Sequence, residues 1–273
     1  MSVLNKKIKF NNGEEIPQFG LGTYKLDDEK ATYDVIIAAL KAGYLHIDTA
    51  QIYGNQKLIA KALKDSQVPR EQIFITSKIW NSDHGYEETK KAIDRILAEL
   101  EITYIDLVLI HWPTPKRLEC WKALEEAVAA KKIRSIGLSN FQIVHIEELL
   151  KNCQIKPVIN QFELHPALQR KDLVKYLQDN DIVVESWGTL IRGKCFEVEQ
   201  VKVLAEKYQK SPAQICLRWA FQQGFVIIPK SSKPHRLIEN TEIEDFALTA
   251  EDMALLATIP EYRDGPDPDN FDF

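Results

Sequence analysis

Several features that would assign a chain to a class directly are missing from these 273 residues. No apolar run is long enough to span a bilayer, and no continuous apolar stretch follows the charges near the N-terminus as in a signal peptide. Basic residues are not in excess, because the formal net charge is -5 at pH 7, and this argues against polyanionic partners. We therefore expect a soluble, cytoplasmic protein that binds neither nucleic acid nor membranes.

Cysteine is scarce, and its scattered positions are Cys120, Cys153, Cys195 and Cys216. These residues form no C-x-x-C pair and no His/Cys cluster with metal spacing, so we expect reduced thiols and no metal site. Gly/Ser-rich linkers, low-complexity tracts and long runs of like charge, which mark domain boundaries, are also missing. The sequence therefore predicts one domain over residues 1–273, with 260–273 as a C-terminal tail.

The sequence does contain a regular alternation of short β-branched runs with amphipathic helical patterns. Several runs are apolar at successive positions, as expected for strands that a parallel sheet buries on both faces. The eight runs lie at residues 18–22, 44–48, 73–78, 105–111, 133–140, 157–163, 182–187 and 225–230. Eight strand-helix units in a chain of this length predict an α/β fold, a closed (β/α)8 TIM barrel.

The segments between the runs have helical periodicity and helix-start signals. Segment 85–102 places its apolar residues at the spacing i, i+3, i+4, i+7, which lies on one helical face. A helix expected after Ser211 begins with an N-cap and a capping box closed by Gln214. Thr249 and Asp252 repeat that arrangement near the C-terminus.

An open doubly wound sheet is the alternative arrangement of alternating strands and helices. Its dinucleotide fingerprint, G-x-G-x-x-G, is absent, because "GLGTYK" at 20–25 lacks the third glycine and the helix that it should begin. We therefore favour the barrel. Ahead of the first strand, residues 8–17 place an Asn-Gly turn between two short apolar stretches, which predicts a β-hairpin that caps the barrel floor.

Polar and aromatic side chains end most of the predicted strands. Barrel active sites lie at the carboxyl ends of the strands, so these residues should gather on one rim. In chain order they are Asp48, Tyr53 in the following loop, Lys78, His111, Ser139, Asn140, Gln161, Trp187 and Lys230. Singly, each has a structural explanation: Asp48 can cap the following loop, 49–55, or pair with Lys78, and His111 can be a core histidine. Tyr53 can be a rim aromatic with its hydroxyl in water. Their placement at one end favours a catalytic site.

Four of these residues suggest acid catalysis. A phenol has a pKa of about 10, and a nearby ammonium lowers that value by favouring the phenolate. Lys78 can supply this charge to Tyr53, and Asp48 can keep Lys78 charged and oriented. His111 can exchange a hydrogen bond with a substrate oxygen. We therefore expect these four residues to be catalytic.

The chain resembles the aldo-keto reductase superfamily, especially its short-tailed bacterial members similar to diketogluconate reductases. The resemblance rests on six ordered motifs, "GYLHIDTAQIYGN", "ITSKIWN", "LIHWP", "IGLSNF", "NQFELHP" and "IPKSSKPHRLIEN". It implies an NADPH-dependent carbonyl reductase, acting on CH-OH donors with NADP as acceptor, on a TIM barrel. It also implies a monomer with a small-molecule carbonyl substrate, in which Tyr53 is the general acid and His111 orients the carbonyl.

The resemblance further implies which residues hold the nicotinamide and adenine ends of NADP(H). Ser139, Asn140 and Gln161 match the positions that bind the carboxamide, and Trp187 matches the aromatic residue that stacks on the ring. The remaining matches are Glu239 and Asn240 on the adenine side, and Gly188 and Leu190, more weakly, in the pyrophosphate loop.

The phosphate site has a physical basis of its own. Its residues lie at a strand end and at the start of a short helix, and they are Lys230, Ser231, Ser232 and Arg236. Backbone N–H groups and a guanidinium can clamp a phosphate there. Two cations suit the 2′-phosphate of NADP better than the bare ribose of NAD. The alternative is a solvated basic helix start.

Three residues depart from the pattern of the family. Leu45 replaces a common Arg, Gln56 a usual Glu, and Thr189 a common Pro, and none of these changes removes a catalytic group. Thr189 makes the pyrophosphate loop, including Arg192, harder to assign. The substrate pocket is expected to include Tyr24, Trp80 and Trp112, although core or rim packing explains these aromatics equally well.

Two other functions are compatible with the same residues. Lys78 could act as a Schiff-base nucleophile in a non-redox barrel enzyme. Alternatively, an NADPH-binding barrel could serve as a non-catalytic regulatory subunit. The sequence leaves open the substrate, the strictness of the preference for NADPH and the conformation of the tail.

Overall fold

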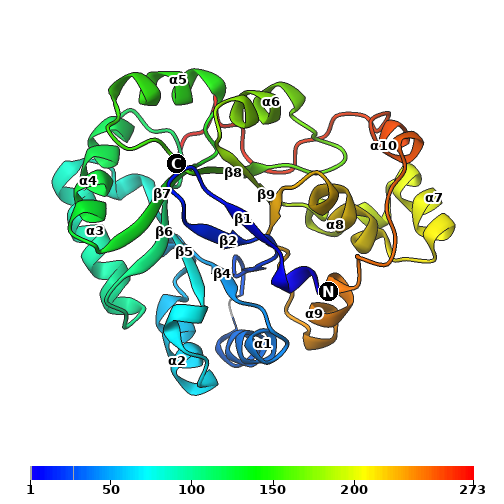
Figure 1. Cartoon of the computed structure of the whole chain (residues 1–273), viewed down its shortest axis with the longest axis horizontal. Helices are drawn as coiled ribbons and strands as arrows, with labels where there is room; N and C mark the ends of the chain where they lie inside the picture. Colours follow the sequence, from blue (N-terminus) through cyan, green and yellow to red (C-terminus); the bar gives the residue numbers. More distant parts are fainter. Residues whose placement is uncertain (1, 27) are drawn as a thin grey trace.

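The computed structural model describes residues 2–26 and 28–273 and places eight parallel strands side by side in chain order (Figure 1). They are β3 (Leu21–Gly22), β4 (His46–Asp48), β5 (Phe74–Ile79), β6 (Ile105–Ile110), β7 (Ile133–Ser139), β8 (Ile159–Glu163), β9 (Val183–Trp187) and β10 (Val226–Ile227). The ends of the sheet meet where Phe19 bridges Ile227. At this seam the N–H of Gly20 donates to the carbonyl of Ile227 over 2.8 Å, and the N–H of Ile227 donates to that of Gln18 over 2.9 Å. The eight predicted strands and the TIM barrel are confirmed.

Helices surround the barrel on its outside (Figure 1). The α-helices are α1 (Glu29–Lys41), α2 (Gln56–Ser66), α3 (Tyr86–Glu99), α4 (Arg117–Ala129), α5 (Ile143–Asn152), α6 (Lys171–Asp179), α7 (Glu199–Tyr208), α8 (Pro212–Gln222), α9 (Pro234–Thr241) and α10 (Ala250–Leu256). Short 3-10 helices are η1 (Val3–Asn5), η2 (Gln51–Tyr53), η3 (Arg70–Gln72), η4 (Asn81–Asp83) and η5 (Ile191–Phe196). In the described part of the chain, no helix is long and apolar enough to cross a membrane.

The predicted helix-start signals are present. Oγ of Ser211 accepts from the N–H of Gln214 over 3.3 Å, and the Gln214 side chain accepts from the N–H of Ser211 over 2.9 Å. Thr249 and Asp252 form the same capping box at α10. Such a box satisfies two N–H groups that have no partner within the helix. Local signals in the sequence therefore determine where α8, which precedes β10, and α10, which precedes the tail, begin.

The predicted N-terminal hairpin closes the amino end of the barrel. Its strands β1 (Lys7–Lys9) and β2 (Glu15–Pro17) pair antiparallel. Beside the turn, the amide of Asn11 donates to the carbonyls of Pro157 (2.9 Å) and Asp181 (3.1 Å), which precede β8 and β9. Above it lies a packed apolar interior made of Phe10, Ile16, Phe74, Leu107, Leu109, Val158, Ile159 and Val226. The hairpin and this interior place the polar strand ends at the opposite, carboxyl end.

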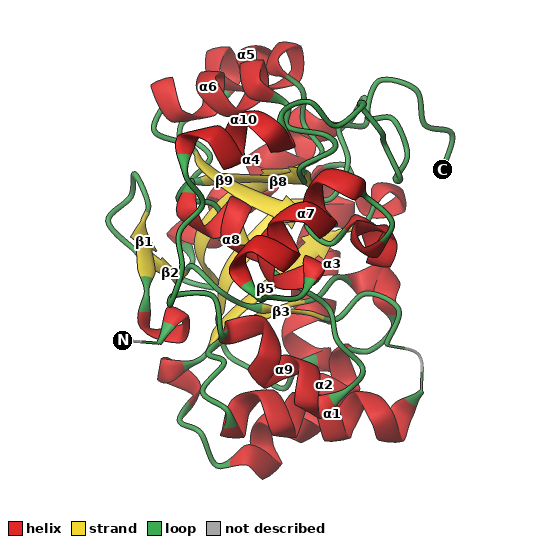
Figure 2. Cartoon of the chain, turned by 90° about the vertical axis from the view of Figure 1, so that its right-hand side faces the viewer, coloured by secondary structure: helices red, strands yellow, loops and turns green. Residues whose placement is uncertain are grey.

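The C-terminal tail, which periodicity does not predict, runs across the carboxyl end. Figure 2 shows the tail on the side of the barrel opposite to the hairpin. The buried carboxylate of Glu163 fixes it, accepting from the N–H of Asp264 over 2.7 Å and from that of Gly265 over 2.9 Å. Asp264 in turn pairs with Arg192 (2.9 Å) and Lys194 (2.8 Å) in η5. The tail is thus joined to the ends of two neighbouring strands.

Candidate active site

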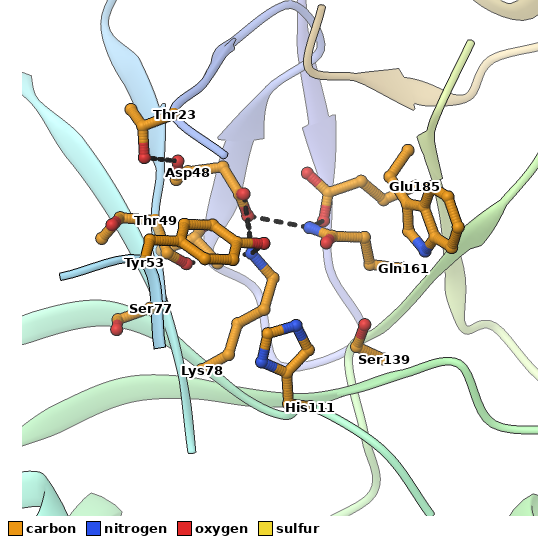
Figure 3. A network of polar contacts seen from close by, with 12 residues as sticks. Thr23, Asp48, Thr49, Tyr53, Ser77, Lys78, His111, Ser139, Gln161 and Glu185 are labelled. Atoms are coloured by element: carbon orange, nitrogen blue, oxygen red, sulfur yellow. Dashed lines mark hydrogen bonds and ion pairs between the residues drawn. The ribbon is translucent and has the colours of Figure 1, made fainter. Parts of the chain in front are cut away.

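The four residues expected to be catalytic lie together at the carboxyl end of the barrel, although they come from separate parts of the chain (Figure 3). Asp48 ends β4, Tyr53 ends η2, Lys78 lies in β5 and His111 follows β6. Lys78 is fully buried, Asp48 is 2% exposed and His111 is 8% exposed, whereas Tyr53 is half-buried. These four residues are called the catalytic group after the role expected of them. Their side at Tyr53 is open toward the carboxyl end of the barrel, which is called the mouth.

The ammonium of Lys78 is held by three partners. It donates to both carboxylate oxygens of Asp48 over 2.6 and 2.8 Å, and to the carbonyl of Thr49 over 2.9 Å. It also donates to the hydroxyl oxygen of Tyr53 over 3.4 Å. Burial is the largest single effect and lowers the pKa of Lys78, but Asp48, Tyr53 and Glu185 together outweigh it, so the pKa is raised. Lys78 is therefore a permanent cation beside the phenol.

The pKa of Tyr53 differs from the value that the sequence suggests. Lys78 does lower it, but burial is the larger effect, and the pKa rises to about 12. The expected net lowering is therefore wrong, since burial disfavours the phenolate. At neutral pH the phenol is therefore protonated.

His111 lies across from Tyr53, with ring centroids 5.9 Å apart in an edge-to-face arrangement. Burial and the nearby Lys78 hold the pKa of His111 well below its usual range, so the ring is neutral. Its Nδ1 is buried and has no hydrogen-bond partner among the described residues. A neutral imidazole has one donor and one acceptor nitrogen, which suits an oriented hydrogen bond to a carbonyl oxygen.

The side chains expected to hold the nicotinamide lie beside this group. Trp187 donates from Nε1 to Oδ1 of Asn140 over 2.9 Å, and Asn140 donates from Nδ2 to the carbonyl of His111 (3.0 Å) and to Oγ of Ser139 (3.1 Å). Gln161 donates from Nε2 to Oδ2 of Asp48 over 2.8 Å. Trp187 is half-buried, so part of its ring is accessible. The structure thus brings these four residues together with the catalytic group.

The expected phosphate site lies at the start of α9, outside the catalytic group. Lys230, Ser232 and Arg236 are exposed there. Ser231 is buried and accepts from the N–H of Lys233 over 3.0 Å. Farther along α9, Glu239 is half-buried and Asn240 is buried. In residues 2–26 and 28–273, no acidic side chain lies within 4 Å of the charged nitrogens of Lys230 or Arg236, so both exposed cations are available to an anion.

The loop after β9 shows how the departures from the family pattern are accommodated. Thr189, in place of Pro, is buried with its hydroxyl 2.6 Å from that of Ser186. Gly188 and Leu190 are half-buried beside it, and Arg192 is paired with the tail. On the other side of the barrel, Gln56 accepts from the hydroxyl of Ser77 over 2.7 Å, and Leu45 is half-buried. None of these residues disturbs the catalytic group.

The mouth is lined by aromatic side chains. Trp80 lies 5.1 Å from His111, and Tyr24, which is 47% exposed, lies 5.0 Å from Tyr53, measured between ring centroids. Trp112 is buried nearby and packs against the tail. Of the three positions expected to line the pocket, Tyr24 thus contacts Tyr53, Trp80 contacts His111, and Trp112 contacts the tail.

Three residues of the site were missed by the sequence analysis. Phe273 stacks on Trp80, with centroids 5.7 Å apart and planes 4° apart, and Phe271 lies 5.1 Å from Trp112. No periodicity in the tail indicates these contacts. Glu185, buried in β9, accepts from Nε2 of Gln161 over 3.0 Å. A single acid inside an apolar run, the same signal that identified Asp48, could have revealed it.

Comparisons with known proteins extend over the same elements. Residues 18–261 match the sequence profile described as Aldo/keto reductase family. The chain is 46% identical to the Glyoxal reductase of Bacillus subtilis (strain 168) over 272 residues, covering 99% of each chain. It is 41% identical to the Methylglyoxal reductase DkgA of Escherichia coli (strain K12), covering 97% of each. A solved structure of a Gox0644 variant in complex with NADPH superimposes with a TM-score of 0.92 at 37% identity, covering 98% of this chain and 99% of that one.

Proposed function

The chain belongs to the aldo/keto reductase family, and on that premise we propose that it is an NADPH-dependent reductase of small aldehydes and ketones with Tyr53 as the general acid. The single observation that carries the proposal is the position of the Lys78 ammonium, between the Asp48 carboxylate and the Tyr53 hydroxyl. At the carboxyl end of a barrel, this arrangement suits an acid that becomes negatively charged when it gives up its proton, because the ammonium stabilises the phenolate.

The residues around the catalytic group suit a dinucleotide cofactor. NADPH, when bound, supplies the hydride. Ser139, Asn140, Gln161 and Trp187 would hold its nicotinamide, and the exposed cations Lys230 and Arg236 would hold its 2′-phosphate. Further contacts with the cofactor are assigned to Gly188, Leu190, Ser231, Ser232, Glu239 and Asn240. These residues suit a phosphate group, because two exposed cations lie at or near the start of helix α9.

The chain's own residues account for the proton. As the carbonyl carbon gains a hydride, its oxygen becomes an alkoxide, and Tyr53 transfers the phenolic proton to that oxygen. The resulting phenolate is stabilised by Lys78, whose charge Asp48 maintains. After the product leaves, bulk solvent returns a proton to Tyr53. Neutral His111 orients the carbonyl with a hydrogen bond, and the surrounding aromatic rings exclude water.

The proposal is tested by following the absorbance of NADPH and of NADH with a panel of aldehydes, ketones and keto-sugars. The names of the two bacterial relatives make glyoxal and methylglyoxal the first substrates to try. We expect consumption of NADPH with at least one carbonyl, by a cytoplasmic monomer. Absence of turnover with every carbonyl, together with cofactor binding, would favour the regulatory alternative. Borohydride trapping of a carbonyl on Lys78 would favour the Schiff-base alternative, against which the triple hydrogen bonding of that amine argues.

An Arg236→Ala variant is expected to lose preference for NADPH over NADH. A charge-assisted hydrogen bond contributes about 1.5–3 kcal/mol, so the ratio of the two affinities should fall at least about tenfold. Calorimetric titration of each cofactor measures this ratio. Arg95→Ala, which removes an exposed arginine from α3, is the matched control and should change neither affinity. An unchanged ratio for Arg236→Ala would contradict the phosphate assignment.

A further inference from the structure

A second buried acid lies beneath the catalytic group and has no part in the chemistry above. Glu185 is in the middle of β9, has no exposed surface and points into the barrel toward Gln161 (Figure 3). Its Oε2 accepts from Nε2 of Gln161 over 3.0 Å. Its Oε1 is buried and has no hydrogen-bond partner in the described ranges. A buried ionised carboxylate with one unpartnered oxygen is costly, so its protonation state needs an account.

Glu185 and Asp48 share a single donor group. Nε2 of Gln161 lies 2.8 Å from Oδ2 of Asp48 and 3.0 Å from Oε2 of Glu185, so the two acids use both hydrogens of one amide. Carboxylates this close in a buried site do not both ionise unless cations compensate them. The amide also becomes fixed, with its nitrogen toward the two acids and its oxygen away from them.

The charges around Glu185 decide which acid keeps the proton. The cation facing it is Lys78 from β5, whose ammonium contacts Asp48 at 2.6 and 2.8 Å and therefore compensates Asp48. His46 from β4 is 4.0 Å from Oε1 of Glu185, but that nitrogen lies 3.1 Å from the hydroxyl of Thr76. Burial lowers the pKa of His46 to about 3, so this histidine is neutral. Asp48 is thus the ionised acid.

We propose that Glu185 is a positioning residue that carries a proton at neutral pH and, together with Asp48, fixes the amide of Gln161 beside the Lys78-Tyr53 pair. With that proton present, Asp48, Lys78 and Glu185 have a net charge of zero. The effect on Tyr53 rests on the proposed function, whereas the proton on Glu185 does not. Burial and, next, the charge of Asp48 raise the pKa of Glu185 to about 8, in agreement with the geometry.

Loss of the Glu185 proton at alkaline pH should make Tyr53 a weaker acid. A second anion near Lys78 opposes the transfer of negative charge to Tyr53, because like charges repel in a poorly solvated site. Reduction by the wild type should therefore decline as pH rises through about 8. Gln at position 185 is uncharged at every pH and should remove this part of the decline.

The protonation of Glu185 is measured without any substrate, by carbon NMR of the full chain with labelled glutamate carboxyl carbons. The titration is recorded with and without NADPH. The Glu185 signal is identified by its loss in Glu185→Gln, or in Glu185→Leu if the first variant folds poorly. We expect a midpoint near pH 8. Titration in the ordinary glutamate range, below about pH 5, would overturn the proposal. Glu163→Gln identifies the signal of a matched buried glutamate. Burial raises the pKa of Glu163, but hydrogen bonds from His165 and from two backbone N–H groups outweigh it and lower the pKa, so this signal should show no midpoint near pH 8.

The positioning role is tested by the pH profile of kcat. The ratio of kcat at about pH 9 to that at about pH 7 should be at least about threefold higher in Glu185→Gln than in the wild type, because a pKa near 8 ionises most of the acid in that interval. The Glu163→Gln profile should keep the alkaline decline. An unchanged ratio in Glu185→Gln, with the NMR midpoint near 8, would overturn the link to Tyr53. Lack of carbonyl reduction at any pH would instead contradict the proposed function. The NMR titration would still show whether Glu185 carries a proton at neutral pH.

Discussion

A Tyr53→Phe variant is expected to reduce carbonyls at least about 10²–10⁴ times more slowly than the wild type while binding NADPH nearly as well. The substitution removes only the hydroxyl that accepts from Lys78. The ring itself keeps its contacts with Tyr24 and His111, so the mouth retains its shape. Single-turnover measurements with excess enzyme give the rate of the chemical step, and quenching of tryptophan fluorescence gives the affinity for NADPH.

The control for this variant is Tyr86→Phe. Tyr86 lies at the start of α3 and donates its hydroxyl hydrogen to Glu126 on the outside of the barrel. Its loss should leave the turnover unchanged. If Tyr53→Phe also kept the wild-type rate, another group would have to protonate the alkoxide, and Tyr53 would have no role as acid.

An Asp48→Asn variant is expected to lose both stability and turnover. Lys78 is fully buried, so the substitution removes the charged carboxylate that its ammonium contacts and replaces it with an uncharged amide. Breaking a buried ion pair in this way costs about 3–5 kcal/mol of unfolding free energy. Turnover should fall because an unpaired Lys78 sheds its proton and no longer stabilises the phenolate. Urea unfolding and steady-state kinetics measure the two effects.

Two further variants separate stability from catalysis. Asp48→Asn combined with Lys78→Met removes the unpaired charge, so it should recover part of the unfolding free energy and none of the turnover. Asp106→Asn makes the same substitution at a buried acid that pairs with Arg70 at 2.6 Å. It should lower stability and leave kcat unchanged. Full turnover by Asp48→Asn would show that Lys78 holds its charge without Asp48.

The fold could be predicted because the local signals for strands and helices agreed with the alternation of strands and helices along the whole chain. Buried parallel strands have continuous apolar runs, and the polar residues that end them mark one rim of a barrel. Asp48, Lys78 and His111 therefore point to the site before any contact is known, and the family resemblance, now confirmed, agrees with them. The sign of the pKa shift of Tyr53 could not be found in this way, since burial depends on the three-dimensional surroundings.

The remaining parts of the site depend on contacts between distant segments. Phe271 and Phe273 reach the mouth because Glu163 binds two backbone N–H groups of the tail, and backbone groups leave no mark in a sequence. Gly265 has a similar role: a Cβ there would lie 2.3 Å from the ring of Trp187, so only glycine lets the tail lie against the indole. Such a close approach is a property of packing and cannot be read from composition.

The seam between Phe19 and Ile227 also bears on how the protein is made. These partners are separated by about 200 residues, so a growing chain on the ribosome cannot complete the cylinder until its last strand has been synthesised. Asp48 and Lys78 are only 30 positions apart and are available to each other much earlier. The apolar interior of the barrel therefore stays incomplete, without the contact between its first and last strands, until Ile227 has been synthesised.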